Sequence, residues 1–201
     1  MTAARRWTAL LPAFERALLP LGVVALVYYG GSIGMEKLYQ IRSKWSFERE
    51  TSERGVRPEA AALSLASDAL GFKPPLGRLQ IPSIDLDVMV LEGTDGADLN
   101  RGVGHIPGTS PLGGDGNVGI AGHRDGFFRE LRSLSKGDRI LVTTRERTSI
   151  YWVSDSRVVG PGDVEVLDHA ERPRLTLVTC YPFGYIGRAP KRYVVLADLA
   201  S

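Results

Sequence analysis

The feature that most limits the fold of this chain is a series of short apolar segments after residue 75, separated by glycine, proline and aspartate. In several of these segments, such as Gly77-Arg-Leu-Gln-Ile81, apolar residues alternate with polar ones. A period of two is typical of half-buried strands. The predicted strands are residues 77–81, 86–91, 117–121, 138–143, 149–153, 175–179 and 192–196. Only short helices are predicted, near 95–101 and 126–134. This pattern predicts a mainly β fold that is closed or nearly closed.

The strand-rich region begins after Lys73-Pro-Pro75, because proline lacks an amide hydrogen and clashes with the preceding helical turn. We therefore predict one globular domain over residues 75–201. Residues 36–74 precede it as a linker or stalk, charged at first and then rich in alanine. A hairpin turn is predicted at residues 145–147.

The N-terminal region contains 19 residues without a charge, from Ala17 to Met35. A helix of that length would span roughly 28 Å, close to the thickness of a bilayer core. We predict a transmembrane helix over residues 17–35 after a short segment, 1–16. A cleaved signal peptide and a buried core helix are the alternatives. Basic residues occur on both sides of the stretch, so charge alone leaves its orientation open.

The charge of the predicted domain argues against nucleic-acid binding. Residues 61–201 carry sixteen Lys or Arg and seventeen Asp or Glu, which makes the domain almost neutral. Proteins that bind nucleic acids usually present a basic surface. We therefore expect no nucleic-acid partner.

Cys180 is the only cysteine and directly follows the predicted strand 175–179. It has no partner for a disulfide within the chain, so a reactive thiol is the favoured interpretation. A cysteine nucleophile needs a base that stabilises the thiolate and later protonates a leaving amine. His123 lies in a glycine-rich loop after a predicted strand and is the favoured base. His105 and His169 remain alternatives at this point.

Arg192 begins the last predicted strand. A solvated charge at a strand end is the ordinary interpretation of such an arginine. If strands 175–179 and 192–196 pair antiparallel, however, Cys180 and Arg192 meet at the same edge of the sheet. A guanidinium beside the thiol could stabilise an oxyanion.

Three separated motifs stand out: Asn117-Val-Gly-Ile-Ala-Gly-His-Arg124, Leu175-Thr-Leu-Val-Thr-Cys180 and Pro190-Lys-Arg-Tyr-Val-Val195. Together, and in this order, they resemble the sortases, the membrane-anchored cysteine transpeptidases of bacterial surfaces. Gly104-His-Ile-Pro-Gly-Thr109 is a further match. The residues from Cys180 to Arg192 look most like class D.

The resemblance implies an eight-stranded β-barrel with Cys180, His123 and Arg192 as catalytic residues. It also implies cleavage of an LPxTG-like sorting signal between Thr and Gly, a thioacyl intermediate on Cys180, and transfer to an amine acceptor in peptidoglycan or pilin. A loop between residues 159 and 174 would read the signal. The implied location is the cell membrane, single-pass, with a cytoplasmic N-terminus and an extracytoplasmic catalytic domain.

Several alternatives remain at the level of single residues and of function. Arg188 could contact substrate or acceptor, or be solvated, and Asp125 could orient His123 or cap the following helix. We predict no cofactor and no metal, because the cysteine and histidines lack zinc-ligand spacing and Asp95 and Asp98 form no convincing calcium set. A hydrolytic cysteine peptidase and a non-catalytic peptide-binding barrel are the competing functions.

Overall fold

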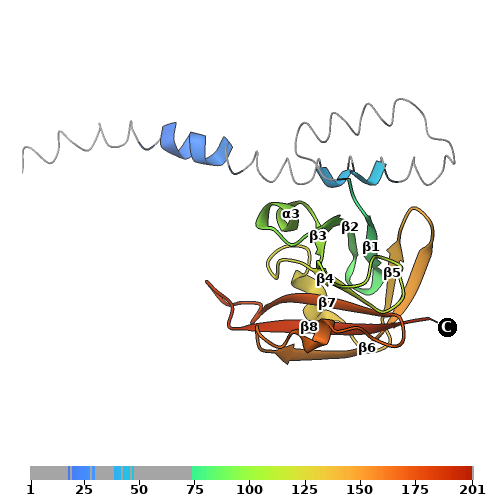
Figure 1. Ribbon diagram of the computed structural model, residues 1–201. Coiled ribbons are helices and arrows are strands. Elements are labelled where there is room, and N and C mark those ends of the chain that lie inside the picture. Colours follow the sequence, from blue (N-terminus) through green and yellow to red (C-terminus); the bar gives the residue numbers. More distant parts are fainter. Residues whose placement is uncertain are drawn as a thin grey trace, which may run out of the picture. The chain divides into compact units, whose positions relative to one another are not determined.

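The alternating segments form an eight-stranded β-barrel in the computed structural model (Figure 1), which describes residues 18, 20–27, 29, 39–41, 43–45, 47 and 74–200. The strands are β1 (Gly77–Ile81), β2 (Leu86–Glu92), β3 (Val103–His105), β4 (Asn117–Ala121), β5 (Arg139–Thr143), β6 (Thr148–Val159), β7 (Arg174–Tyr181) and β8 (Lys191–Leu199). The helices are η1 (Pro82–Ile84), α3 (Gly96–Arg101), η2 (Arg129–Ser133) and η3 (Val164–Leu167). The prediction of a mainly β barrel with short helices is confirmed.

All seven predicted strands are present, and the turn predicted at residues 145–147 joins β5 to β6. The strand that the sequence did not indicate is β3, which is only three residues long. It forms through parallel pairing with β2, where Leu91 lies opposite Gly104. A side chain at Gly104 would place its Cβ 2.0 Å from the carbonyl oxygen of Gly93. This strand therefore depends on a long-range approach of two backbones and has no alternating pattern of its own.

The barrel closes in the order β1-β2-β3-β4-β7-β8-β6-β5, and β5 pairs with β1. Most neighbours are antiparallel, but β2–β3 and β4–β7 are parallel pairs. Strand β7 therefore lies between β4 and β8, two strands that are more than sixty residues apart in the sequence. This crossover brings the three sequence motifs to neighbouring strands.

Alternate residues of each strand fill the barrel interior. The fully or almost fully buried side chains of this core include Leu79, Ile81, Val88, Val118, Ile120, Ile140, Leu175, Leu177, Val195 and Ala197. Burying a side chain of this size stabilises the fold by about 1.5–3 kcal/mol. The interior is packed with side chains, so a functional site must lie on the outside or at an end of the barrel.

Residues before the barrel also contribute contacts to its compact unit, which spans Gln40–Ser201. The side chain of Gln40 accepts a hydrogen bond from the amide of Met89 (3.1 Å) and donates to the carbonyl of Arg101. Lys44 Nζ lies 2.9 Å from both the carbonyl and the carboxylate of Asp87. The segment that contains Gln40 and Lys44 thus packs against β2.

The predicted transmembrane helix and the segment before it lie largely outside the described residues. Residues 18, 20–27 and 29 are helical. Within the ranges that the structure describes, no helix combines the length and the apolar character that a membrane crossing requires. Most of the predicted linker over residues 36–74 also lies outside the described residues.

Candidate active site

The parallel pairing of β4 with β7 sets the positions of His123 and Cys180. Ala121 lies opposite Val178 at the end of this pairing, and His123 follows in the loop two residues after Ala121, as Cys180 follows two residues after Val178. The start of this loop is held by two hydrogen bonds: the amide of Gly122 donates to the carbonyl of Val178 (3.1 Å), and Thr179 Oγ1 donates to the carbonyl of Gly122 (2.7 Å). The loop that carries His123 is therefore fixed to the strand that carries the thiol.

The antiparallel pairing of β7 with β8 sets the position of Arg192. Cys180 and Arg192 are direct register partners. Side chains of opposed residues in an antiparallel pair lie on the same face of the sheet, with Cβ atoms about 4.5–5.5 Å apart. The expected meeting of Cys180 and Arg192 at one sheet edge is confirmed.

Side-chain alternation shows that Cys180 and Arg192 face outwards. Leu177 in β7 and Val195 in β8 point into the core, so Cys180 and Arg192 are on the opposite face. His123 lies in the loop after β4, where it is half-buried and lines a surface pocket together with Cys180 and Arg192. Thr179, on the inner side of β7, is 2% exposed, whereas Cys180 is half-buried.

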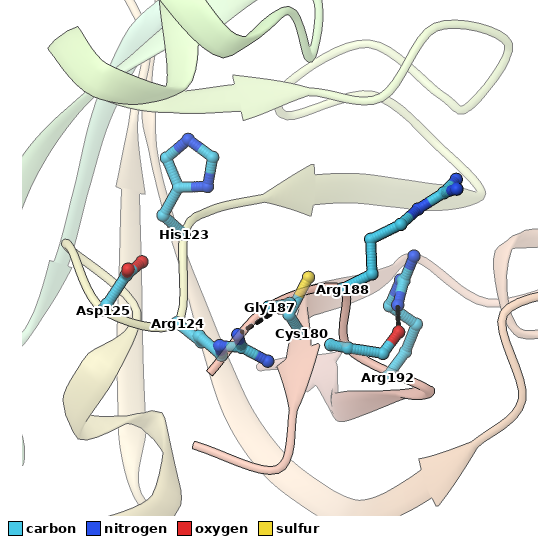
Figure 2. Close-up of a pocket in the computed structure, with 8 residues that line it drawn as sticks. His123, Arg124, Asp125, Cys180, Gly187, Arg188 and Arg192 are labelled. Atoms are coloured by element: carbon cyan, nitrogen blue, oxygen red, sulfur yellow. Dashed lines mark hydrogen bonds between the residues drawn. The ribbon is translucent and has the colours of Figure 1, made fainter. Parts of the chain in front are cut away.

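These residues line one pocket of about 290 Å³ (Figure 2). Its lining residues are His123, Arg124, Asp125, Cys180, Gly187, Arg188, Ala189 and Arg192. In the described part of the chain no hydrogen bond joins the Cys180 thiol to the His123 imidazole, and both groups are half-buried at the pocket. Catalytic contacts of this kind often tighten only when substrate is bound.

The guanidinium of Arg192 is held by backbone carbonyls close to it in the sequence. Its Nη1 donates to the carbonyl of Lys191 (3.0 Å) and to that of Ala189 (3.3 Å). Figure 2 shows Arg192 at the pocket on the same side of Cys180 as Arg188. These bonds orient the cation beside the thiol, and within residues 74–200 its Nε and Nη2 donate to no other group, which leaves them available to a ligand.

Arg124 is a pocket residue that the sequence analysis did not single out. Its Nη2 donates to the carbonyls of Tyr185 (2.6 Å) and Gly187 (2.9 Å), and its Nη1 donates to the carbonyl of Pro182 (3.3 Å). The guanidinium also lies 5.9 Å from the centre of the Tyr185 ring. Arg124 thus connects the His123 loop to the segment between β7 and β8. Its partners are about sixty positions away, so no local sequence signal indicated this role.

The two alternative histidines lie outside the pocket. His105 is buried (6% exposed), with Nδ1 3.2 Å from Glu92 Oε1 and Nε2 2.9 Å from the carbonyl of Ser110. Both of its nitrogens are therefore used in structural contacts. His169 is exposed beside Gly116.

Asp125 lines the pocket, but within residues 74–200 it makes neither of the contacts considered for it. Its carboxylate forms no hydrogen bond to His123, and helix η2 begins at Arg129 after Phe128 without a side-chain cap. The same part of the chain contains no group of three or more His, Cys, Asp or Glu side chains that could hold a metal ion.

Comparison with known proteins identifies the family. A family model described as a sortase domain matches residues 79–200. The chain belongs to the sortase family. The recognised domain coincides with the barrel and contains all three motifs noted in the sequence.

Similar sortases extend over most of the chain. Sortase D of Bacillus subtilis (strain 168) is 31% identical over 192 residues, which cover 90% of this chain and 96% of that protein. Sortase A of Bacillus anthracis is 32% identical over 149 residues, with 72% of this chain and 68% of that protein covered. A solved structure of a Clostridium perfringens Sortase D5 transpeptidase matches with a TM-score of 0.63 at 26% identity, covering 84% of this chain and 99% of that one.

Family membership makes this sortase a cysteine transpeptidase with a sortase-type barrel. Enzymes of the family cleave an LPxTG-like motif, join the product to an amine acceptor and are typically associated with the cell envelope. The two class D relatives agree with the predicted resemblance of the segment after Cys180 to that class.

Proposed function

We propose that Cys180 is the nucleophile, His123 the general acid and base, and Arg192 the group that stabilises the oxyanion. The observation that carries this proposal is that the three residues line one pocket: Cys180 is the register partner of Arg192, and His123 comes from the loop after β4, which pairs with β7. Strand β7 neighbours both β4 and β8, and neighbouring strands are about 4.8 Å apart, so the three groups border one pocket in which a substrate carbonyl can bind.

The reaction has two steps. In the first, the Cys180 thiolate attacks the threonine carbonyl, the amide bond to glycine breaks, and His123 protonates the departing amine. In the second, an acceptor amine attacks the thioester, loses its proton to His123 and displaces the thiolate as a new amide forms. Arg192 stabilises the negative oxygen in both tetrahedral intermediates.

The proposed substrate is a protein with an LPxTG-like sorting signal, and the proposed acceptor is an amine of peptidoglycan or pilin. The segment between β6 and β7, which contains η3, would form one wall for the signal. Asn117 supports this wall, because its amide nitrogen donates to the carbonyls of Val166 and Asp168 (3.0 Å each). Its Oδ1 accepts a hydrogen bond from Thr176 (2.6 Å).

We further propose that residues 17–35 anchor the enzyme in the cell membrane as a single span. Residues 1–16 would be cytoplasmic, residues 36–74 a linker, and residues 75–201 an extracytoplasmic catalytic domain. The support is the uncharged stretch of 19 residues, whose length suits a bilayer core. Membrane fractionation of cells that express the full chain, and of cells that express residues 36–201, tests this assignment.

Transpeptidation by the full chain can be measured with a fluorogenic LPxTG-containing peptide and an added amine. The expected product is the new amide, with the thioacyl enzyme detectable by mass spectrometry as an adduct on Cys180. The Cys180→Ala variant should form neither adduct nor amide. Ser133→Ala is the matched control, because it removes a γ atom from an exposed residue of η2 outside the pocket, and it should retain full activity.

The added amine also distinguishes transfer from hydrolysis. In a transpeptidase it diverts product from free acid to amide in proportion to its concentration, whereas in a simple hydrolase the acid remains the product. Amide formation that persists in Cys180→Ala would refute the proposed nucleophile.

A further inference from the structure

The pocket has an uneven distribution of charge. Its lining residues include three arginines, Arg124, Arg188 and Arg192, but only one acidic residue, Asp125. Figure 2 shows Arg188 and Arg192 on the side of Cys180 away from Asp125. One end of the pocket is therefore strongly positive and the thiol lies beside it.

The positive end belongs to a segment with defined internal contacts. Arg124 binds the carbonyls of Pro182, Tyr185 and Gly187, and Gly187 directly precedes Arg188. At the base of this segment, the rings of Phe183 and Tyr193 pack edge to face at 5.4 Å. The position of Arg188 at the pocket is thus set by contacts on its N-terminal side and by β8 on its C-terminal side.

Among the described residues, no carboxylate pairs with either cation at this end. Arg192 donates to two backbone carbonyls, and within the part of the chain that the structure describes neither Arg188 nor Arg192 forms an ion pair. By contrast, Arg78 and Arg174 each bind a carboxylate, at 2.7 Å and 3.0 Å. Two neighbouring guanidinium groups without a counter-ion form a site suited to an anion, because planar guanidinium groups match the geometry of carboxylates.

We propose that Arg188, together with Arg192, binds a carboxylate of a reactant at the active site. This inference rests on the proposed function and makes Arg188 a determinant of specificity. Two reactants could supply the carboxylate: the residue of the sorting signal before threonine, or the acceptor close to its amine. The chemistry of recognition is the same for both.

Alkylation of Cys180 provides a test that needs neither substrate nor turnover. Iodoacetate and iodoacetamide both form a C–S bond to the thiolate and release iodide, but only iodoacetate carries a carboxylate. Both reagents react with the same thiolate, so the fraction of ionised Cys180 cancels when the rate constant for iodoacetate is divided by that for iodoacetamide. In the wild-type enzyme this ratio should exceed that of a free thiol such as glutathione, and Arg188→Gln should lower it about 5-fold, since an exposed charge-assisted hydrogen bond contributes about 1 kcal/mol.

Arg129→Gln is the matched control, because it removes the same charge from an exposed residue of η2 that does not line the pocket. It should leave the ratio unchanged. Arg188→Lys should retain part of the preference for iodoacetate. Equal ratios in the wild type, Arg188→Gln and Arg129→Gln would overturn the proposal, whatever the outcome of the transpeptidation assay.

Paired substrates then identify which reactant carries the carboxylate. One pair differs in the sorting peptide, Leu-Pro-Glu-Thr-Gly against Leu-Pro-Gln-Thr-Gly, and the other in the acceptor, diglycine against diglycinamide. The member with the carboxylate should have the lower KM in one of these pairs, and Arg188→Gln should remove that advantage without changing the KM of the neutral member. Absence of a carboxylate preference in both pairs would also overturn the proposal.

Turnover of the neutral substrates by Arg188→Gln separates this inference from the proposed function. The variant keeps Cys180, His123 and Arg192, so it should still form amide from Leu-Pro-Gln-Thr-Gly and diglycinamide. Loss of the carboxylate preference with retained amide formation supports both proposals. Retained preference with retained amide formation refutes the role of Arg188 alone.

Discussion

At the scale of single residues, the site depends on where the backbone directs each side chain. Cys180 and Arg192 are paired across two strands, and alternation turns both away from the core. The neighbouring inward position is occupied by Thr179, which is buried and donates a hydrogen bond to the carbonyl of Gly122. A cysteine at that position would be shielded from a substrate. The outward position leaves the sulfur half-buried and accessible to a substrate.

A prediction at this scale concerns His123. With His123 as acid and base, the wild-type kcat/KM should depend on pH as a bell-shaped curve, because one group must be deprotonated and another protonated. His123→Ala should lower kcat/KM by about 10²- to 10⁴-fold and remove one limb of the curve. Initial rates between pH 5 and pH 10 measure both effects. Full activity with an unchanged curve would exclude this role for His123.

At the scale of elements, Arg124 connects two segments that border the pocket. It contacts three carbonyls of the segment between β7 and β8, while its own loop follows β4. Hydrogen bonds from a charged donor to neutral carbonyls contribute about 1 kcal/mol each when they are partly exposed. The position of the segment after Tyr181 should therefore depend on this single side chain.

We expect Arg124→Gln to loosen the segment over residues 182–190 without unfolding the barrel. Amide hydrogen exchange there should become about 10-fold faster, while the exchange of β7 and β8 stays unchanged. The KM for the peptide should rise more than kcat falls, and Arg124→Lys should restore part of the loss. Arg132→Gln is the control, because among the described residues the hydrogen bond and the ion pair of Arg132 are both with the neighbouring Glu130. Unchanged exchange in Arg124→Gln would show that the three bonds do not hold the segment.

The passage from β4 to the His123 loop requires a glycine at position 122. A Cβ there would lie 2.7 Å from ring atoms of Phe128, which is fully buried. Gly122→Ala should therefore lower the free energy of unfolding by about 1–3 kcal/mol through overpacking. Gly184→Ala is the control, since a Cβ at that position meets no atom within 4 Å. Urea denaturation of both variants measures the difference, and equal stabilities would contradict the predicted clash.

At the scale of the whole molecule, Asp87 joins β1, β2 and the segment before the barrel. Its carboxylate accepts two bonds from Arg78 (2.7 Å each) and lies 2.9 Å from Lys44 Nζ. The hydrogen bond to Arg78 is the main cause that lowers the pKa of Asp87 below its ordinary value of 3.8, and burial opposes the shift. The ionised carboxylate is therefore favoured in the folded protein.

The lowered pKa of Asp87 makes the free energy of unfolding depend on pH. The contribution of Asp87 should be complete above about pH 4 and should be lost as the pH falls through the lowered pKa, because protonation removes the partner of both cations. The urea midpoint of the wild type should therefore decrease more between pH 6 and pH 3 than that of Asp87→Asn. Asp155→Asn, which changes an exposed residue of β6, is the control and should follow the wild type. Parallel curves for the wild type and Asp87→Asn would exclude the linkage.

Much of the fold could be predicted because alternation and turn residues act locally. They indicated seven strands and the hairpin at residues 145–147. Strand β3 and the extension of β6 to Val159 were missed, because both depend on pairing with distant strands. In the candidate site, His123, Cys180 and Arg192 were named from local motifs and chemistry. Arg124 was missed because its partners are supplied by a segment about sixty residues away.

The sequence by itself determined the strand segments, the single thiol, the glycine-rich loop of His123 and the family resemblance, since each is written in neighbouring residues. Only the tertiary structure decided that β7 lies between β4 and β8. It also decided which of the three histidines shares the pocket with Cys180, and that Arg188 and Arg192 lie on the side of Cys180 away from Asp125. The physical reason is that strand order and register follow from burial of the whole core. Local periodicity fixes which face a residue occupies but leaves open which residue is opposite to it.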